Sequence, residues 1–158
     1  MEKQMDREIR KTFWNAFHSS PVVMMRLNEA AGHAEPMTAQ LDKEAHHAIW
    51  FFAKRGNRIA RGGKAMGQVA TLRHDVFASL SGLLVEETDP AVRTKHWSHA
   101  TEAWFPNGKD DPNVIMLRFD IDDAEVWTAH IGVKGAFNLL TGRPIDPSQA
   151  GDHVLGAV

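Results

Sequence analysis

Three basic side chains and an asparagine follow directly on an aromatic run near residue 50. The run is His-Ala-Ile-Trp-Phe-Phe-Ala over residues 47–53, and the polar cluster is Lys54-Arg55-Gly56-Asn57-Arg58. Backbone N–H groups, an asparagine amide and guanidinium groups all donate hydrogen bonds to phosphate oxygens. An aromatic wall that ends in such a cluster suits a ligand with a flat ring and a phosphate tail. The same residues also suit a solvated loop made basic for solubility, and composition does not decide between the two interpretations.

Nine histidines raise the question of a metal site. His46 and His47 are adjacent, so on a strand their side chains face opposite sides. His96 and His99 lie three residues apart on a predicted helix, which is a workable spacing for two ligands. No third ligand nearby completes a set, and we therefore predict no metal site.

Other catalytic chemistries find little support in the sequence. The chain has no cysteine, which excludes disulfides, thiolate ligands and cysteine nucleophiles. Ser79 and Ser81 lack the Gly-x-Ser-x-Gly elbow of serine hydrolases. Residues 61–67 contain three glycines and a lysine but not the spacing of a phosphate-binding loop. We assign no catalytic acid, base or nucleophile from the residues.

Length and charge limit the possible classes of protein. The 158 residues suffice for one domain, and 43% apolar with 24% charged residues is the balance of a globular protein. A net charge of −2 argues against a dedicated nucleic-acid binder. The amino terminus does not resemble a signal peptide, and no apolar run approaches the ~20 residues that span a bilayer. We expect a cytoplasmic protein without nucleic-acid or membrane partners.

The elements that must position the basic cluster are mostly strands. An apolar stripe predicts a helix over residues 5–18, and a barrel is expected over about residues 21–131. A short helix and a loose tail are predicted for residues 132–158. The six predicted strands cover residues 22–28, 36–42, 47–53, 64–72, 76–85 and 113–127. Short links between them predict a mainly β fold, a six-stranded antiparallel barrel with flanking helices, as a single domain over residues 1–158.

Local signals add detail to this arrangement. The charged link at residues 42–44 predicts a short turn between two consecutive strands, and residues 73–75 predict an antiparallel hairpin. Gly82 within a strand predicts a bulge or a close approach. Asp89-Pro90 is a strong helix start, and one helix is predicted to run from there to Trp104.

Five stretches in this order resemble the split barrels of the pyridoxamine 5'-phosphate oxidase-like superfamily, and within it the general stress proteins. The stretches are Pro-Met-Thr-Ala-Gln at 36–40, Ile-Trp-Phe-Phe at 49–52, Asp-Val-Phe-Ala-Ser-Leu-Ser-Gly at 75–82, Trp-Phe-Pro-Asn-Gly-Lys-Asp-Asp-Pro at 104–112 and Ala-Glu-Val-Trp at 124–127. The resemblance spans roughly residues 7–144.

The resemblance implies a homodimer that binds FMN, with FAD as the other option, in two clefts at the subunit interface. Met37, Thr38 and Ala39 are expected beside the isoalloxazine ring. Phe52 and Ala53 are expected along the ribityl chain. The remaining expected cofactor contacts are Lys54, Asn57 and Arg58 at the phosphate, and Trp127 from the partner subunit.

Two departures from the family pattern affect the expected function. Many relatives carry an arginine where this chain has Glu35, and a carboxylate facing the ring would lower the flavin's reduction potential. The Arg-x-His pattern by which vitamin B6 oxidases hold substrate is absent after Trp127. We therefore do not expect a true pyridoxamine-phosphate oxidase.

Three functions remain open from the sequence. The first is an FMN-dependent oxidoreductase acting on an unknown small molecule. The second is a flavin-binding stress protein without turnover of its own. The third is a split barrel that has lost its cofactor, for which Glu35 and Ala53 are the warning signs.

Overall fold

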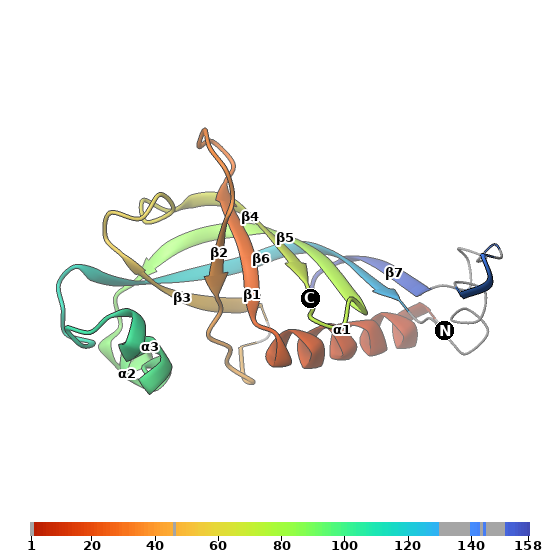
Figure 1. The fold of residues 1–158 in the computed structure, drawn as a ribbon, viewed down its shortest axis with the longest axis horizontal. Coiled ribbons are helices and arrows are strands. Elements are labelled where there is room, and N and C mark those ends of the chain that lie inside the picture. The colour runs from red at the N-terminus through yellow and green to blue at the C-terminus, as the bar shows by residue number, and fades with distance from the viewer. Residues whose placement is uncertain (1, 46, 130–139, 143, 145–150) are drawn as a thin grey trace.

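The computed structural model describes residues 2–45, 47–129, 140–142, 144 and 151–158. Helix α1 (Glu2–Ser19) precedes all the strands, and the short helices α2 (Pro90–His96) and α3 (His99–Trp104) lie between the fifth and sixth strands (Figure 1). The strands are β1 (Val22–Leu27), β2 (Glu35–Thr38), β3 (Ala48–Lys54), β4 (Gly63–Ala70), β5 (Val76–Glu87), β6 (Val114–Ala129) and β7 (Gly151–Gly156).

The strands form one antiparallel sheet that closes on itself. Its order is β2-β1-β4-β5-β6-β3, and β7 pairs with β6. The first half of β6 pairs with β3 and the second half pairs with β7. An isolated bridge between Gln40 and Trp50 joins the two ends of the sheet, with N···O distances of 2.7 and 3.1 Å. The predicted mainly β class with flanking helices is confirmed.

Alternating side chains fill the barrel. In β1 the inward residues are buried and their neighbours exposed, the pattern of a strand with one face on a core. Strand β3 is instead buried on both faces, because its inner face lines the barrel and Val92 of α2, Trp97 and Phe105 pack on its outer face. Ile9, Phe13 and Phe17 of α1 are buried against the same barrel core.

Three details of the sequence prediction are wrong. A seventh strand, β7, occupies residues that were predicted to be a loose tail. The helix predicted from residue 90 to Trp104 is two helices, because Ser98 caps a new one by accepting a hydrogen bond from Thr101 N at 3.2 Å. The predicted strands at 36–42 and 47–53 do not form a hairpin, since β2 pairs with β1 and β3 with β6.

The predicted carboxy-terminal helix falls mostly outside the described residues. Leu140 and Thr141 are helical, and the rest of residues 132–139 is not described.

A second apolar cluster lies between β3 and α2. The rings of Trp50 and His96 stack there, with centroids 5.1 Å apart and planes 26° from parallel. Within the described residues, neither Trp50 Nε1 nor His96 Nε2 has a hydrogen-bond partner, although both atoms are buried. Burial lowers the pKa of His96, against the opposing effect of nearby Asp42 and with a smaller contribution from Lys95.

This buried histidine makes stability depend on pH. Because the pKa of His96 is lower in the folded state, the neutral ring contributes its full stabilisation above about pH 6.5. As the pH drops below this value, the unfolded chain takes up a proton more readily than the folded chain. The free energy of unfolding then decreases by at most about 1.4 kcal/mol per pH unit. We expect urea unfolding between about pH 7 and pH 5 to show a shallower pH slope for His96→Phe than for the wild type. The exposed His99→Phe serves as the matched control and should keep the wild-type slope. Equal pH slopes of unfolding free energy for the wild type and His96→Phe would rule out His96 as the source of the pH dependence.

Candidate functional site

One cleft of about 1140 Å³ lies between the barrel and the α3 region. Its barrel side comes from the end of β2 and from β3 with the turn that follows it. Its helical side comes from α3 and the loop that leads into β6. The principal lining residues are Pro36, Met37, Thr38, Ala39, Gln40, Phe52, Ala53, Lys54, Arg55, Gly56 and Asn57 on the first side, and Ser98, Ala100, Thr101, Trp104, Phe105, Pro106, Asn107, Asp111 and Asn113 on the second.

The end of β2 presents the Thr38 side chain and a backbone held by hydrogen bonds to the cleft. Met37 and Ala39 are buried, whereas Thr38 between them is exposed. Ala39 N donates to Pro21 O at 2.7 Å, and the next residue forms the bridge that closes the barrel. Met37, Thr38 and Ala39 all line the cleft, on a strand end held from both sides. Their expected contact with a flavin ring stays a prediction.

The turn after β3 holds its polar groups by internal hydrogen bonds. Asn57 N donates to Lys54 O at 2.9 Å, and the Asn57 side-chain oxygen accepts from Ile59 N at 2.9 Å. That contact orients the Asn57 amide and leaves its nitrogen with no hydrogen bond in the described part of the chain. Lys54 forms no ion pair with any described residue. Both side chains line the cleft, together with the expected Phe52 and Ala53.

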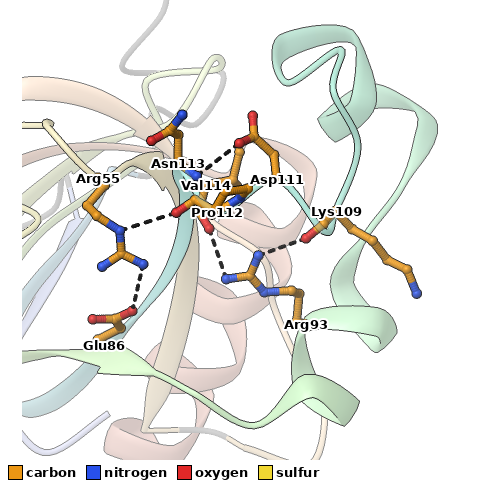
Figure 2. A network of polar contacts seen from close by, with 8 residues as sticks. All are labelled: Arg55, Glu86, Arg93, Lys109, Asp111, Pro112, Asn113 and Val114. Carbon is orange, nitrogen blue, oxygen red and sulfur yellow. Dashed lines mark hydrogen bonds and ion pairs between the residues drawn. The ribbon is translucent and has the colours of Figure 1, made fainter.

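Two arginines hold the loop opposite this turn (Figure 2). Arg55 donates from Nε to Pro112 O at 3.2 Å, and its backbone N donates to Asn113 O at 2.7 Å. Arg93 of α2 donates to Lys109 O at 2.8 Å and to Val114 O at 3.0 Å. Arg55 therefore anchors the loop rather than standing free as a cation, and the two sides of the cleft are joined through it.

Arg58 lies outside the cleft lining. Its guanidinium forms an ion pair with Glu35, Nε to Oε2 at 3.2 Å, and donates to His33 O at 3.0 Å. Glu35 does not line the cleft either. The expected effect of Glu35 on a bound ring therefore stays a prediction.

Trp127 also lies away from this cleft, on the outer face of β6. Its ring stacks on His153 of β7, with centroids 5.2 Å apart and planes 16° from parallel. His153 Nε2 in turn lies 2.5 Å from Glu125 Oε1. The expected approach of Trp127 to a cofactor involves a second subunit, so it stays a prediction.

Sequence reasoning missed the helical side of the cleft. Trp104, Phe105 and Asn107 belong to one of the stretches that carried the resemblance, yet no role was assigned to them. The signal was present in that stretch, since an aromatic pair at a helix end next to Pro-Asn-Gly is unusual for a purely solvated turn.

The histidines considered as metal ligands do not converge. His96 is buried against Trp50, while His99 is exposed and lies 3.7 Å from Glu102. Within the described residues there is no group of three metal-ligating side chains. No described helix is long and apolar enough to cross a membrane.

The closed antiparallel sheet, its flanking helices and the cleft beside β2 and β3 define a split-barrel protein. The chain matches the family model "Pyridoxamine 5'-phosphate oxidase like" over residues 7–143 and belongs to that family. Its fold and relatives confirm the resemblance to the general stress proteins.

Individual relatives agree with this assignment. General stress protein 26 of Bacillus subtilis is 31% identical over 55 residues, which cover 35% of this chain and 39% of that protein. The structure of a protein described as general stress protein 26 from Jannaschia sp. CCS1 has a TM-score of 0.79 and 25% identity, covering 96% of this chain and 99% of the other. The general stress FMN/FAD binding protein of Xanthomonas citri has a TM-score of 0.71 and 39% identity, covering 77% of this chain and 89% of the other.

Proposed function

We propose that this chain binds a flavin nucleotide, FMN or FAD, in the cleft beside β2 and β3. The observation that carries the proposal is the composition of that cleft, in which every expected flavin contact except Arg58 and Trp127 meets in one place. A relative with 39% identity is named as an FMN/FAD binding protein, which supports the same ligand class.

The residues present fit such a ligand. Thr38 and the fixed backbone after β2 offer polar contacts to the edge of a flat ring, and Phe52 offers an apolar surface. Lys54 supplies a cation without an internal partner in the described residues, and the oriented Asn57 amide supplies a second donor for phosphate. When bound, the flavin supplies the hydride chemistry, and the chain's residues bind, orient and shield it.

Arg58 differs from the other expected phosphate contacts, because it does not line the cleft. Its guanidinium is engaged by Glu35 and the His33 carbonyl, so it reaches a phosphate only by exchanging these partners. We propose that Lys54 and Asn57 form the phosphate seat and that Arg58 supports the β2 end by pairing with Glu35.

A bound flavin can serve catalysis or binding alone. We propose an oxidoreductase that reduces or oxidises a small molecule, with a flavin-binding stress protein without turnover as the second candidate. The test is anaerobic addition of NADH or NADPH to the flavin-loaded protein. Bleaching of the flavin, and its return with an added acceptor, supports the oxidoreductase; an unbleached flavin supports the second candidate.

We further propose a homodimer through the outer face of the sheet. Phe77, Trp127 and His153 pair across β5, β6 and β7 in one row, and the apolar side chains of Met24, Leu83 and Leu155 are exposed on the same sheet. Exposed apolar side chains gathered on one sheet are typical of a protein interface. Trp127 in this row would come from one subunit toward the cleft of the other.

Phe77→Asp should therefore convert the dimer to a monomer. A carboxylate in the centre of an apolar interface loses its hydration without gaining a partner, which weakens association by at least about a hundredfold. Analytical ultracentrifugation over a concentration series measures the change, and Phe77→Leu is the matched control that should remain dimeric. A monomeric wild type, or a Phe77→Asp dimer of unchanged affinity, would refute this interface.

A further inference from the structure

Trp104 is an exposed aromatic side chain in the wall of the cleft. It ends α3 and is 79% exposed, although tryptophan is among the most buried residue types on average. Its ring has no stacking partner among the described residues, whereas Trp14, Trp50, Trp97 and Trp127 each have an aromatic neighbour. A large ring that lines a cleft and lacks a partner is available for a ligand ring.

The backbone beneath Trp104 is firmly held. The adjacent Phe105 packs near Trp97, with centroids 6.4 Å apart, and Trp97 meets Phe52 edge-on at 5.2 Å. The helix end is closed by the hydrogen bond from Phe105 N to Thr101 O at 3.1 Å. Trp104 therefore projects from a rigid support, which favours ligand binding because little order must be gained.

The wall that carries Trp104 adjoins the proposed phosphate seat. The turn with Lys54 and Asn57 is joined to residues 112 and 113 through the backbone and side chain of Arg55. The loop that follows α3 passes through Lys109 and Asp111 to that junction (Figure 2). A ligand whose phosphate lies at the turn thus has Trp104 available in the same cleft.

The cleft leaves room for a ligand longer than FMN. Its volume is about 1140 Å³, and clefts of ~300–1,000 Å³ already enclose a drug-sized ligand. The ring end and the phosphate of FMN account for the β2 side and the turn. The α3 side, with Trp104 and Asn107, is left without a role in FMN binding.

We propose that Trp104 is a stacking platform for the adenine of FAD, and that this chain therefore binds FAD more tightly than FMN. This inference rests on the proposed flavin function. FAD continues beyond the phosphate through a second phosphate and a ribose to adenine, which is a flat ring at the far end of the molecule. Aromatic side chains bind bases by stacking on their faces.

Asn107 adds a means of recognising adenine over other flat rings. It lines the cleft three residues after Trp104, and its only hydrogen bond among the described residues is a long one, Nδ2 to Asp111 Oδ2 at 3.5 Å. An asparagine amide pairs with the N6 and N7 edge of adenine by one donor and one acceptor. Stacking on Trp104 and pairing with Asn107 together select a purine with an exocyclic amine.

Titration of the wild type and Trp104→Ala with FMN and with FAD tests the proposal. We expect Trp104→Ala to weaken FAD binding by roughly tenfold to a hundredfold, as loss of one base–aromatic stack implies, while FMN affinity stays within about twofold. Trp104→Phe should keep much of the preference for FAD. Because Trp104 is exposed, neither change should impair folding, and thermal unfolding of both variants checks this.

AMP is a second probe that does not depend on the flavin ring. It should compete with FAD on the wild type, and its binding should be lost in Trp104→Ala. Equal wild-type affinity for FMN and FAD, or an equal loss of both in Trp104→Ala, would overturn the platform while leaving the flavin cleft intact. A wild type that binds FMN and FAD equally poorly would overturn the proposed function and this inference together.

Discussion

Replacing Lys54 by glutamate is expected to lower flavin affinity by about a hundredfold or more. Lys54 lines the cleft without an ion-pair partner in the described chain. A charge-assisted hydrogen bond to phosphate contributes roughly 1.5–3 kcal/mol, and the new carboxylate adds repulsion to that loss. Fluorescence titration with FMN measures the change directly.

Two further variants help to interpret the effect of Lys54→Glu. Lys54→Met removes the charge without reversing it, and we expect an affinity between those of the wild type and Lys54→Glu. Lys11→Glu makes the same charge change on an exposed position of α1 and should leave affinity unchanged. If Lys54→Glu binds FMN as well as Lys11→Glu does, the phosphate does not lie at this turn.

Replacing Gly82 by alanine is expected to destabilise the fold by roughly 3 kcal/mol or more. A methyl group there would lie 2.0 Å from Asp120 O and 2.9 Å from Asp120 C, which are backbone atoms of the neighbouring strand. These atoms cannot move away without breaking the pairing of β5 with β6.

Urea unfolding followed by circular dichroism measures this loss. Gly56→Ala is the matched control, because a methyl group at Gly56 meets nothing within 4 Å. It should retain wild-type stability to within about 1 kcal/mol. A Gly82→Ala protein as stable as Gly56→Ala would contradict the close approach of the two strands.

The position of Gly82 explains how β6 pairs with β3 along its first half and with β7 along its second half. The register between β5 and β6 shifts between Ser81 and Gly82, opposite Ile121 and Asp123. A bulge of this kind bends a strand and increases its twist. The bend separates the part of β6 that pairs with β3 beside the cleft from the part that carries Trp127 and pairs with β7.

Features with a local cause were predictable from the sequence. The hairpin of β4 and β5 follows from the turn at residues 73–75, and the start of α2 follows from Asp89, whose side chain accepts from Ala91 N at 2.9 Å. The bulge at Gly82 was also predicted. Each depends on a few adjacent residues whose backbone preferences point to one conformation.

Features decided by distant contacts were not predictable in this way. The strand pattern at 36–42 and 47–53 fits a hairpin, but β1 and β6 take the pairing edges of these strands. The small and polar residues after 147 do not reveal that the exposed edge of β6 will pair with them. The break between α2 and α3 depends on Trp97 turning inward to pack on Phe52.

In the candidate site too, features with a local cause were predictable and features that depend on distant contacts were not. Residues 37–39 and 52–57 meet in one cleft because they lie at the ends of β2 and β3. Arg58 could not be placed, because its direction depends on Glu35, 23 positions away and on another strand. Trp104 and Asn107 could not be placed either, since the cleft wall exists only once α2 and α3 separate.

The central claim is that the cleft binds a flavin, and the most direct test is whether the protein retains one. The protein is incubated with FMN or FAD, freed of excess nucleotide by gel filtration, and its visible absorption spectrum is recorded. We predict that flavin bands elute with the protein, close to one flavin per chain. A colourless protein after both incubations would contradict the flavin cleft and favour a split barrel that works without this cofactor.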